Sequence, residues 1–183
     1  MLAFEALAGR RIGPSWELVR PLARGGMSAV YLGRHAVTQR EVAVKVIDPK
    51  VFADPAARDR FVREVTAPVR IKHPGIVEIL DAGTDDALGA HFVVMELLEG
   101  HELRKELDVG PMATERAVAL VDALLDPLAA APKAGIVHRD LKPENVFLAA
   151  TADGQWRVKI LDFGIARDLG AGSSTATSST FGT

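Results

Sequence analysis

The chain of 183 residues contains no cysteine. Without cysteine it can form neither a disulfide framework nor a metal site built on thiolates. A large excess of one charge is also absent, because the formal net charge is −2. This near balance argues against the basic field of nucleic-acid-binding proteins and against strong attraction to anionic lipid.

Long apolar runs are absent too. No stretch reaches the roughly 20 apolar residues that a membrane-spanning helix needs. The N-terminal sequence MLAFEALAGRR places a short apolar run before its arginines, the reverse of the order in a signal peptide. We therefore expect a cytoplasmic protein, with no membrane segment in this chain and no nucleic-acid partner.

What the chain does have is enough apolar surface for a packed core. Hydrophobic residues make up 48% of it and charged residues 25%, a balance that argues against wholesale disorder. The length suits one domain or part of a larger one.

The first half predicts a small sheet. Strands are expected from the alternation of apolar and polar residues in five runs: residues 16–23, 28–37, 40–48, 76–84 and 91–98. In the third run Val42, Val44 and Val46 share one face, and Lys45 lies on the other. Asp54 and the proline after it suit the N-cap and first position of a helix between the third and fourth strands.

The second half predicts more helix. We expect a short helix over residues 101–110 and a longer one from Thr114 to about residue 135. Short strands are expected next, at residues 136–138, 145–149 and 157–161. After Gly170 the composition narrows to Gly, Ala, Ser and Thr, which is typical of a mobile loop.

The segment HRDLKPEN carries several chemical groups in one polar loop. It contains the carboxylate of Asp140, the lysine Lys142 and the amide of Asn145. LDFGIAR follows and places a second carboxylate, Asp162, at the end of an apolar strand. Asn145 and Asp162 offer the oxygen ligands that magnesium uses when phosphates share it, whereas Asp140 is suited to accept a hydroxyl proton.

Three upstream segments complete the pattern. VAVK places Lys45 on a strand, and FVREV places Glu64 on the predicted helix, where it can pair with Lys45 or with nearby arginines. The sequence LARGGM offers glycine N–H groups that can cradle phosphates.

With VAVK, HRDLKPEN and DFG in this order, the chain from about residue 16 resembles the eukaryotic-type protein kinases, and among them the bacterial serine/threonine kinases. The resemblance implies an α+β, bilobal protein-kinase fold: a complete N-terminal lobe with a five-stranded antiparallel sheet and one helix, and a partial helical C-terminal lobe. We expect an N-terminal arm at residues 1–15, the N-terminal lobe at 16–98 and the partial C-terminal lobe at 99–183.

The resemblance also implies roles for individual residues. Asp140 is the expected catalytic base, and Lys142 is expected to neutralise the transferred phosphoryl group, in a form that favours Ser/Thr over Tyr. Asn145 and Asp162 would hold Mg²⁺, and Lys45 would bind the ATP phosphates. The implied nucleotide contacts, with Met95 as gatekeeper, are Leu22, Ala23, Gly25, Gly26, Ser28, Val30, Ala43, Lys45, Glu64, Met95, Glu96, Leu98, Phe147, Leu161 and Asp162.

The predicted activity is ATP-dependent transfer of phosphoryl groups to Ser or Thr of proteins, in bacterial signalling. Arg139 would grip a phosphate on the activation segment, where Thr175, Thr177 and Thr180 are candidate sites. ATP and a protein substrate are the expected partners, and a kinase–kinase dimer is conceivable.

Some positions depart from the family pattern. The glycine-rich loop has Ala23 and Ser28 where G-x-G-x-x-G has its outer glycines, so we expect weakened but retained nucleotide binding. Pro68 and Pro127 fall inside predicted helices, each at a cost of about 3 kcal/mol.

The chain also stops at Gly182-Thr183, inside the expected activation segment. We therefore expect an exposed apolar side on residues 115–129. This leaves a second hypothesis open, a truncated, weak or inactive kinase that acts as a nucleotide- or partner-binding module. A small-molecule phosphotransferase on the same fold fits less well.

Overall fold

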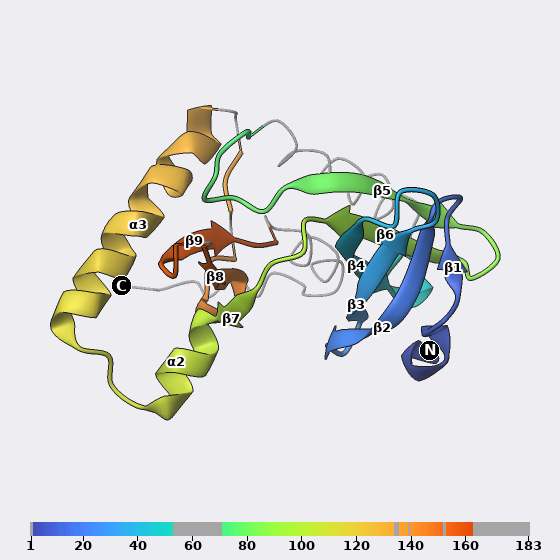
Figure 1. The fold of residues 1–183 in the computed structure, drawn as a ribbon, viewed down its shortest axis with the longest axis horizontal. Coiled ribbons are helices and arrows are strands. Elements are labelled where there is room, and N and C mark those ends of the chain that lie inside the picture. The colour runs from blue at the N-terminus through green and yellow to red at the C-terminus, as the bar shows by residue number, and fades with distance from the viewer. Residues whose placement is uncertain (1, 53–70, 134–135, 139, 152, 163–183) are drawn as a thin grey trace, which may run out of the picture.

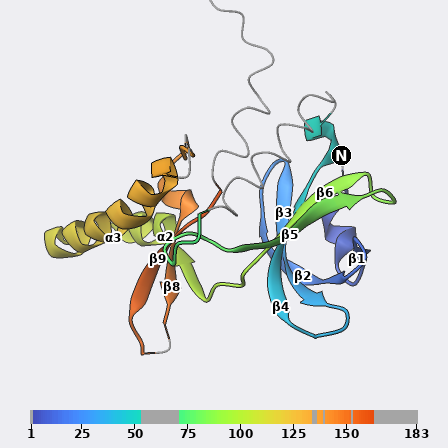
Figure 2. The same cartoon turned by 90° about the horizontal axis from the view of Figure 1, so that it is seen from above.

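The computed structural model describes residues 2–52, 71–133, 136–138, 140–151 and 153–162. They form two bodies that lie side by side, one built on a curved sheet and one containing the longest helix, α3 (Figures 1 and 2). This arrangement agrees with the predicted α+β bilobal fold.

The first body is an antiparallel sheet of six strands in the order β1-β2-β3-β4-β6-β5. The strands are β1 (Arg11–Ile12), β2 (Trp16–Arg24), β3 (Ser28–His35), β4 (Glu41–Ile47), β5 (Ile79–Asp85) and β6 (Ala90–Met95). The five predicted strands are all present. The sixth strand, β1, comes from the predicted N-terminal arm, so the sheet has one short strand more than the five predicted.

The two faces of this sheet differ in what covers them. Val42, Val44 and Val46 of β4 are fully buried in one cluster, as the alternation predicts. A short 3-10 helix, η1 (Phe4–Leu7), contributes Phe4 and Leu7 to the same cluster. The N-terminal segment therefore covers the outer face, and Lys45 lies on the opposite face.

The second body combines a small sheet with two helices. Its strands are β7 (Gly100–Glu102), β8 (Val146–Ala150) and β9 (Trp156–Ile160), and its helices are α2 (Leu103–Val109) and α3 (Thr114–Lys133). Residues 136–138, predicted as a strand, have no regular structure, and the predicted first helix begins only after β7. Two further 3-10 turns are η2 (Pro49–Phe52) and η4 (Pro143–Asn145).

The helix α3 continues through Pro127 without a break. Pro127 is buried, and its ring lies so close to Gly75 that a Cβ on Gly75 would come within 2.9 Å of it. This packing offsets part of the backbone hydrogen bond that proline cannot make. The predicted apolar exposure on this helix is confirmed for Val118, Val121 and Leu125, which are 55–63% exposed.

The segment before β5 connects the two bodies. The Val77 N–H donates to the Ile160 carbonyl, and the Ile160 N–H donates to the Gly75 carbonyl, which joins this segment to β9. Within the described parts of the chain, no helix is long and apolar enough to cross a membrane.

Candidate active site

The polar loop between α3 and β8 brings three predicted residues together. Lys142 Nζ lies 2.8 Å from Asp140 Oδ2. Asn145 donates from Nδ2 to the Asp140 backbone carbonyl at 2.8 Å and to Asp140 Oδ2 at 3.3 Å. The turn η4 makes this possible, because the Asn145 N–H bonds to the Lys142 carbonyl and folds the loop back on itself.

The Asp162 carboxylate is held next to this loop. The Leu161 N–H donates to the Asn145 carbonyl at 2.8 Å, and His138 Nε2 lies 2.8 Å from the Leu161 carbonyl. His138 is only 5% exposed, so its role here is structural. These hydrogen bonds hold Leu161, and with it the start of the segment that carries Asp162, next to His138 and Asn145.

Asp162 itself has an unusual backbone conformation. Its φ of +44° lies in the left-handed region, which is uncommon for any residue other than glycine. Such strain is tolerated where surrounding structure holds it, and it is often found at functional sites. Here the bonds of its neighbour Leu161 and the contact with Lys45 hold the residue in place.

The Lys45 side chain crosses from the first body to the second. Its Nζ lies 2.6 Å from Asp162 Oδ2, and the two side chains are 16% and 34% exposed. Glu64, the predicted partner of Lys45, lies outside the described residues. The cation and the carboxylate are therefore both positioned by this contact between β4 and the end of β9.

The charges of the loop reinforce one another. The hydrogen bond with Asp140 is the largest influence on Lys142 and raises its pKa above the ordinary value, and Asp162 adds to the effect. The raised pKa favours the charged form of Lys142 next to the Asp140 carboxylate. An arrangement of this kind can neutralise developing negative charge while Asp140 accepts a proton.

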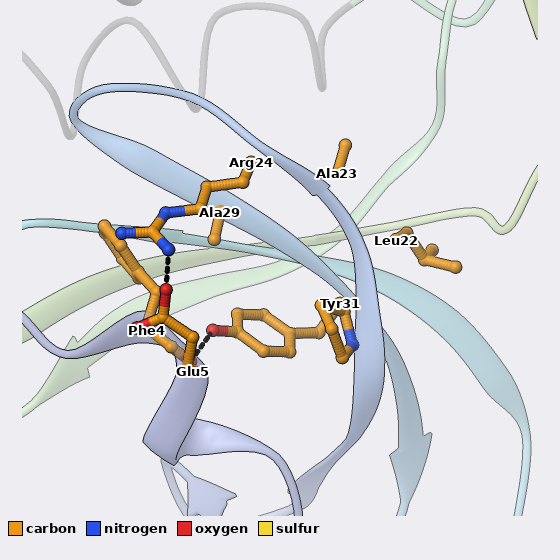
Figure 3. A pocket seen from close by; sticks show the side chains of 8 residues that line it. Phe4, Glu5, Leu22, Ala23, Arg24, Ala29 and Tyr31 are labelled. Atoms are coloured by element: carbon orange, nitrogen blue, oxygen red, sulfur yellow. Dashed lines mark hydrogen bonds and ion pairs between the residues drawn. The ribbon is translucent and has the colours of Figure 1, made fainter.

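Four of the predicted nucleotide contacts, Val30, Ala43, Lys45 and Met95, share one face of the six-stranded sheet. The register pairs Val30 with Lys45 and Ala43 with Met95, and directly paired side chains lie on the same face. Phe147 lies on β8, and Leu161 follows β9 directly. Leu22 is 41% exposed and points away from Phe4 and Tyr31 on the outer side of the sheet (Figure 3).

The chain between β6 and β7 contains an ion pair that the sequence analysis missed. Glu96 Oε1 lies 2.5 Å from Lys159 Nζ on β9, and it also accepts the Glu78 N–H at 2.8 Å. The Glu96 N–H donates in turn to the Glu78 carbonyl. A lysine inside the apolar strand RVKIL was the only available signal, and it did not identify the partner.

The glycine-rich turn lies between β2 and β3. The Gly25 N–H donates to the Ser28 carbonyl at 2.8 Å, and the Met27 carbonyl accepts the Asp48 N–H at 2.9 Å. Ala23 and Gly26 are exposed, and a Cβ on Gly26 would meet no atom within 4 Å. No neighbouring atom therefore crowds Gly26 in the middle of the turn.

The donor set suits a cation shared with phosphates. Among the described residues, no group of three or more His, Cys, Asp or Glu side chains gathers as a self-contained metal site. Asn145 uses Nδ2 for its contacts with Asp140, which leaves Oδ1 on the other side of the amide. One amide oxygen and the Asp162 carboxylate match the few protein ligands that Mg²⁺ takes when phosphates supply others.

Several predicted residues lie outside the described part of the chain. They are Glu64, Arg139, Thr175, Thr177 and Thr180. The described residues bring together Asp140, Lys142, Asn145, Asp162 and Lys45.

Comparison with known proteins shows that the chain is similar to protein kinases. Residues 16–183 match the family model described as the protein kinase domain. The chain is 43% identical over 153 residues to the serine/threonine-protein kinase pkn2 of Myxococcus xanthus, covering 83% of this chain and 18% of that protein. It is 42% identical over 164 residues to PknL of Mycobacterium tuberculosis, covering 88% of this chain and 39% of that protein.

A solved kinase-domain structure is also similar to this chain. The crystal structure of the Mycobacterium tuberculosis PknI kinase domain matches with a TM-score of 0.75 at 33% identity, covering 87% of this chain and 63% of that one. The chain thus spans less than two fifths of these curated relatives and just under two thirds of the solved domain. The family match over residues 16–183, together with the fold, shows that the chain belongs to the protein kinase domain family.

Proposed function

We propose that the chain binds Mg-ATP and transfers the γ-phosphoryl group to Ser or Thr hydroxyls of a protein substrate. The observation that carries this proposal is the convergence of Asp140, Lys142 and Asn145 with Asp162 and Lys45. The five side chains supply a base, two cations and oxygen ligands in two groups, and the hydrogen bond from the Leu161 N–H to the Asn145 carbonyl connects these groups.

Each side chain has a role in the proposed reaction. Asp140 accepts the proton of the attacking hydroxyl and orients it, and Lys142 offsets the negative charge on the transferred group. Lys45 binds the α- and β-phosphates of ATP. The curated relatives are named serine/threonine-protein kinases, and Lys142 two residues after the base favours the same specificity here.

The predicted cofactor is Mg²⁺, for which Asn145 and Asp162 are the proposed ligands. When bound, the ion neutralises phosphate oxygens and fixes their orientation. Lys45 and Asp162 are already in contact, so a cation at Asp162 would be shared with the phosphates that Lys45 binds. Adenine would lie against Ala43 and Met95 on one side and Phe147 on the other.

The binding part of the proposal is tested by thermal unfolding in the presence of Mg-ATP. A ligand that binds only the folded chain stabilises it by about 2.7 kcal/mol at a hundred times its Kd. We expect a rise in Tm with Mg-ATP that is smaller in Asp162→Asn and when magnesium is chelated. No change of Tm at millimolar Mg-ATP would refute nucleotide binding.

The transfer part is tested with radiolabelled ATP. We expect incorporation of label by the chain, and a fall of about 10²–10⁴-fold in Asp140→Asn, because a positioned base contributes that much. Asp153→Asn, in the exposed turn between β8 and β9, is the matched control. Equal labelling by the wild type and Asp140→Asn would rule out catalysis by this chain.

The regulatory part stays a prediction from the sequence. Thr175, Thr177 and Thr180 are the proposed phosphorylation sites, and Arg139 the residue that binds the phosphate. Peptide mapping of the labelled chain by mass spectrometry identifies the modified residues. A cytoplasmic location and a kinase–kinase dimer are part of the same prediction.

A further inference from the structure

The N-terminal segment, residues 2–12, is fastened to the outer face of the first body. Phe4, Leu7 and Ile12 are at most 3% exposed. The Gly9 N–H donates to the Leu18 carbonyl of β2, and the Leu18 N–H donates back to the Arg10 carbonyl. The segment therefore belongs to the sheet whose opposite face carries Lys45.

Two polar connections run from this segment to the glycine-rich turn. Glu5 pairs with Arg24, the residue that precedes Gly25. The Leu2 N–H donates to Asp48 Oδ2 at 2.8 Å, and the Asp48 N–H donates to the Met27 carbonyl inside the turn. One connection thus reaches each side of the turn.

Asp48 is well suited to this task. It is 4% exposed, and it accepts the N–H groups of Leu2 and Lys50. Burial acts to raise its pKa, but the N–H groups of Lys50 and Leu2, together with the positive charges of the N-terminus and Lys50, outweigh burial, and the pKa lies below its ordinary value. The carboxylate therefore stays ionised at neutral pH and keeps both hydrogen bonds.

An open pocket lies beside these two connections. It measures about 320 Å³ and lies between Phe4 and the strand residues Pro21, Ala23, Ala29 and Tyr31 (Figure 3). The hydroxyl of Tyr31 donates to the Phe4 carbonyl below it. Phe4, Ala29 and Tyr31 pack in one cluster of buried residues, so van der Waals contact and the polar connections together hold the segment against the sheet.

The turn itself has few other contacts. Met27 is 69% exposed, and a Cβ on Gly26 would meet no atom within 4 Å. We propose that Glu5 and Asp48 are positioning residues that hold the glycine-rich turn in the conformation that binds the phosphates of the nucleotide. This inference rests on the nucleotide binding proposed above and assigns part of it to a segment outside the matched residues 16–183.

The first test compares Glu5→Gln with Glu41→Gln in this chain. Both glutamates are exposed and pair with an arginine of the same sheet, but Glu41 pairs with Arg34 at the end remote from the turn. The Kd for Mg-ATP is measured with a fluorescent ATP analogue displaced by ATP. We expect it to rise about two- to fivefold in Glu5→Gln, the range of an exposed ion pair, and to stay unchanged in Glu41→Gln.

A charge exchange excludes a general effect of substitution. Arg24→Glu alone is expected to weaken binding as Glu5→Gln does, and Glu5→Arg with Arg24→Glu is expected to restore it. Asp48→Asn, which removes the charge and one acceptor, is expected to weaken binding further. Equal Kd values for the wild type, Glu5→Gln and Asp48→Asn would overturn the inference.

Hydrogen exchange separates this inference from the proposed function. In the nucleotide-free chain, Glu5→Gln is expected to speed exchange at the Gly25 and Asp48 amides, which bond within and to the turn. Glu41→Gln is expected to leave both rates unchanged. If the wild type fails to bind ATP, the proposed function fails, yet the exchange rates still decide whether Glu5 positions the turn. Unchanged exchange in Glu5→Gln would overturn the positioning role.

Discussion

Replacing Lys159 by methionine would remove the ion pair that connects the β6–β7 link to β9. Lys159 and Glu96 are only 13% and 22% exposed, and their charged atoms are 2.5 Å apart. Met keeps most of the length and volume of the lysine stem, so the substitution mainly removes the charge. Glu96 would then retain the Glu78 N–H as a partner but no counter-charge.

The free energy of unfolding that Lys159→Met is expected to lose lies between the values for exposed and for fully buried ion pairs. Exposed ion pairs contribute about 0–1 kcal/mol, whereas breaking a fully buried pair costs about 3–5 kcal/mol. Because the pair is partly buried and Glu96 keeps one hydrogen bond, we expect Lys159→Met to lower the free energy of unfolding by about 2 kcal/mol. For a chain of this length that corresponds to a fall in Tm of about 4–8 °C.

The assay is a double-mutant cycle with Lys159→Met, Glu96→Gln and the double variant, measured by urea unfolding. We expect a coupling energy of at least about 1 kcal/mol, because residues in one network are not additive. High salt should change it little, since burial limits screening. Additivity within about 0.5 kcal/mol would refute the role assigned to this pair. Glu41→Gln, in an exposed pair, is the control and should cost less than 0.5 kcal/mol.

Two further predictions concern the second body. Arg116 donates to both carboxylate oxygens of Glu106 and, with His101, lowers the pKa of Glu106 below its ordinary value. A carboxyl group whose pKa is lowered by folding stabilises the folded chain at pH values above its ordinary pKa, and this stabilisation is lost as the pH falls. The free energy of unfolding lost in Glu106→Gln should therefore be largest at neutral pH and should shrink below pH 4.5. Urea unfolding at several pH values measures it. Gly75→Ala would place a Cβ 2.9 Å from the Pro127 ring and should lower the free energy of unfolding by about 1–3 kcal/mol, as thermal unfolding can measure. If the clash causes this loss, introducing Gly75→Ala into the Pro127→Ala variant should cost less than introducing it into the wild type. An equal loss in both backgrounds would disprove the clash.

Local patterns in the sequence predicted most of the first body. Alternation identified all five long strands, and it placed Val42, Val44 and Val46 on the buried face. Alternation predicts strands because neighbouring side chains of a strand point to opposite faces, so a strand with one buried face has an apolar residue at every second position.

Local patterns failed where distant contacts decide the structure. The sequence placed Pro127 inside the long helix at a local cost, but it did not predict the packing against Gly75 that accompanies the continuous helix. Residues 136–138 looked like a strand, yet no neighbouring strand pairs with them among the described residues. In the same way, β1 is too short to show a period and exists because β2 lies beside it.

The candidate site shows the same division. Residue types and their order along the chain were sufficient to select Lys45, Asp140, Lys142, Asn145 and Asp162, because phosphoryl transfer needs cations, a base and oxygen ligands. Which side chains face one another was decided by the tertiary structure. Lys45 meets Asp162 across 117 positions of sequence, and Lys159 meets Glu96 across 63.

The sequence by itself determined the family, the strands and the chemical groups, since each is carried by a few residues close together along the chain. Only the tertiary structure decided the covering of the outer face, the ion pair at Glu96 and the connections from Leu2 and Glu5 to the glycine-rich turn. Those contacts join residues with no common local pattern. Their geometry follows from how the two bodies and the N-terminal segment pack, which no short stretch of sequence contains.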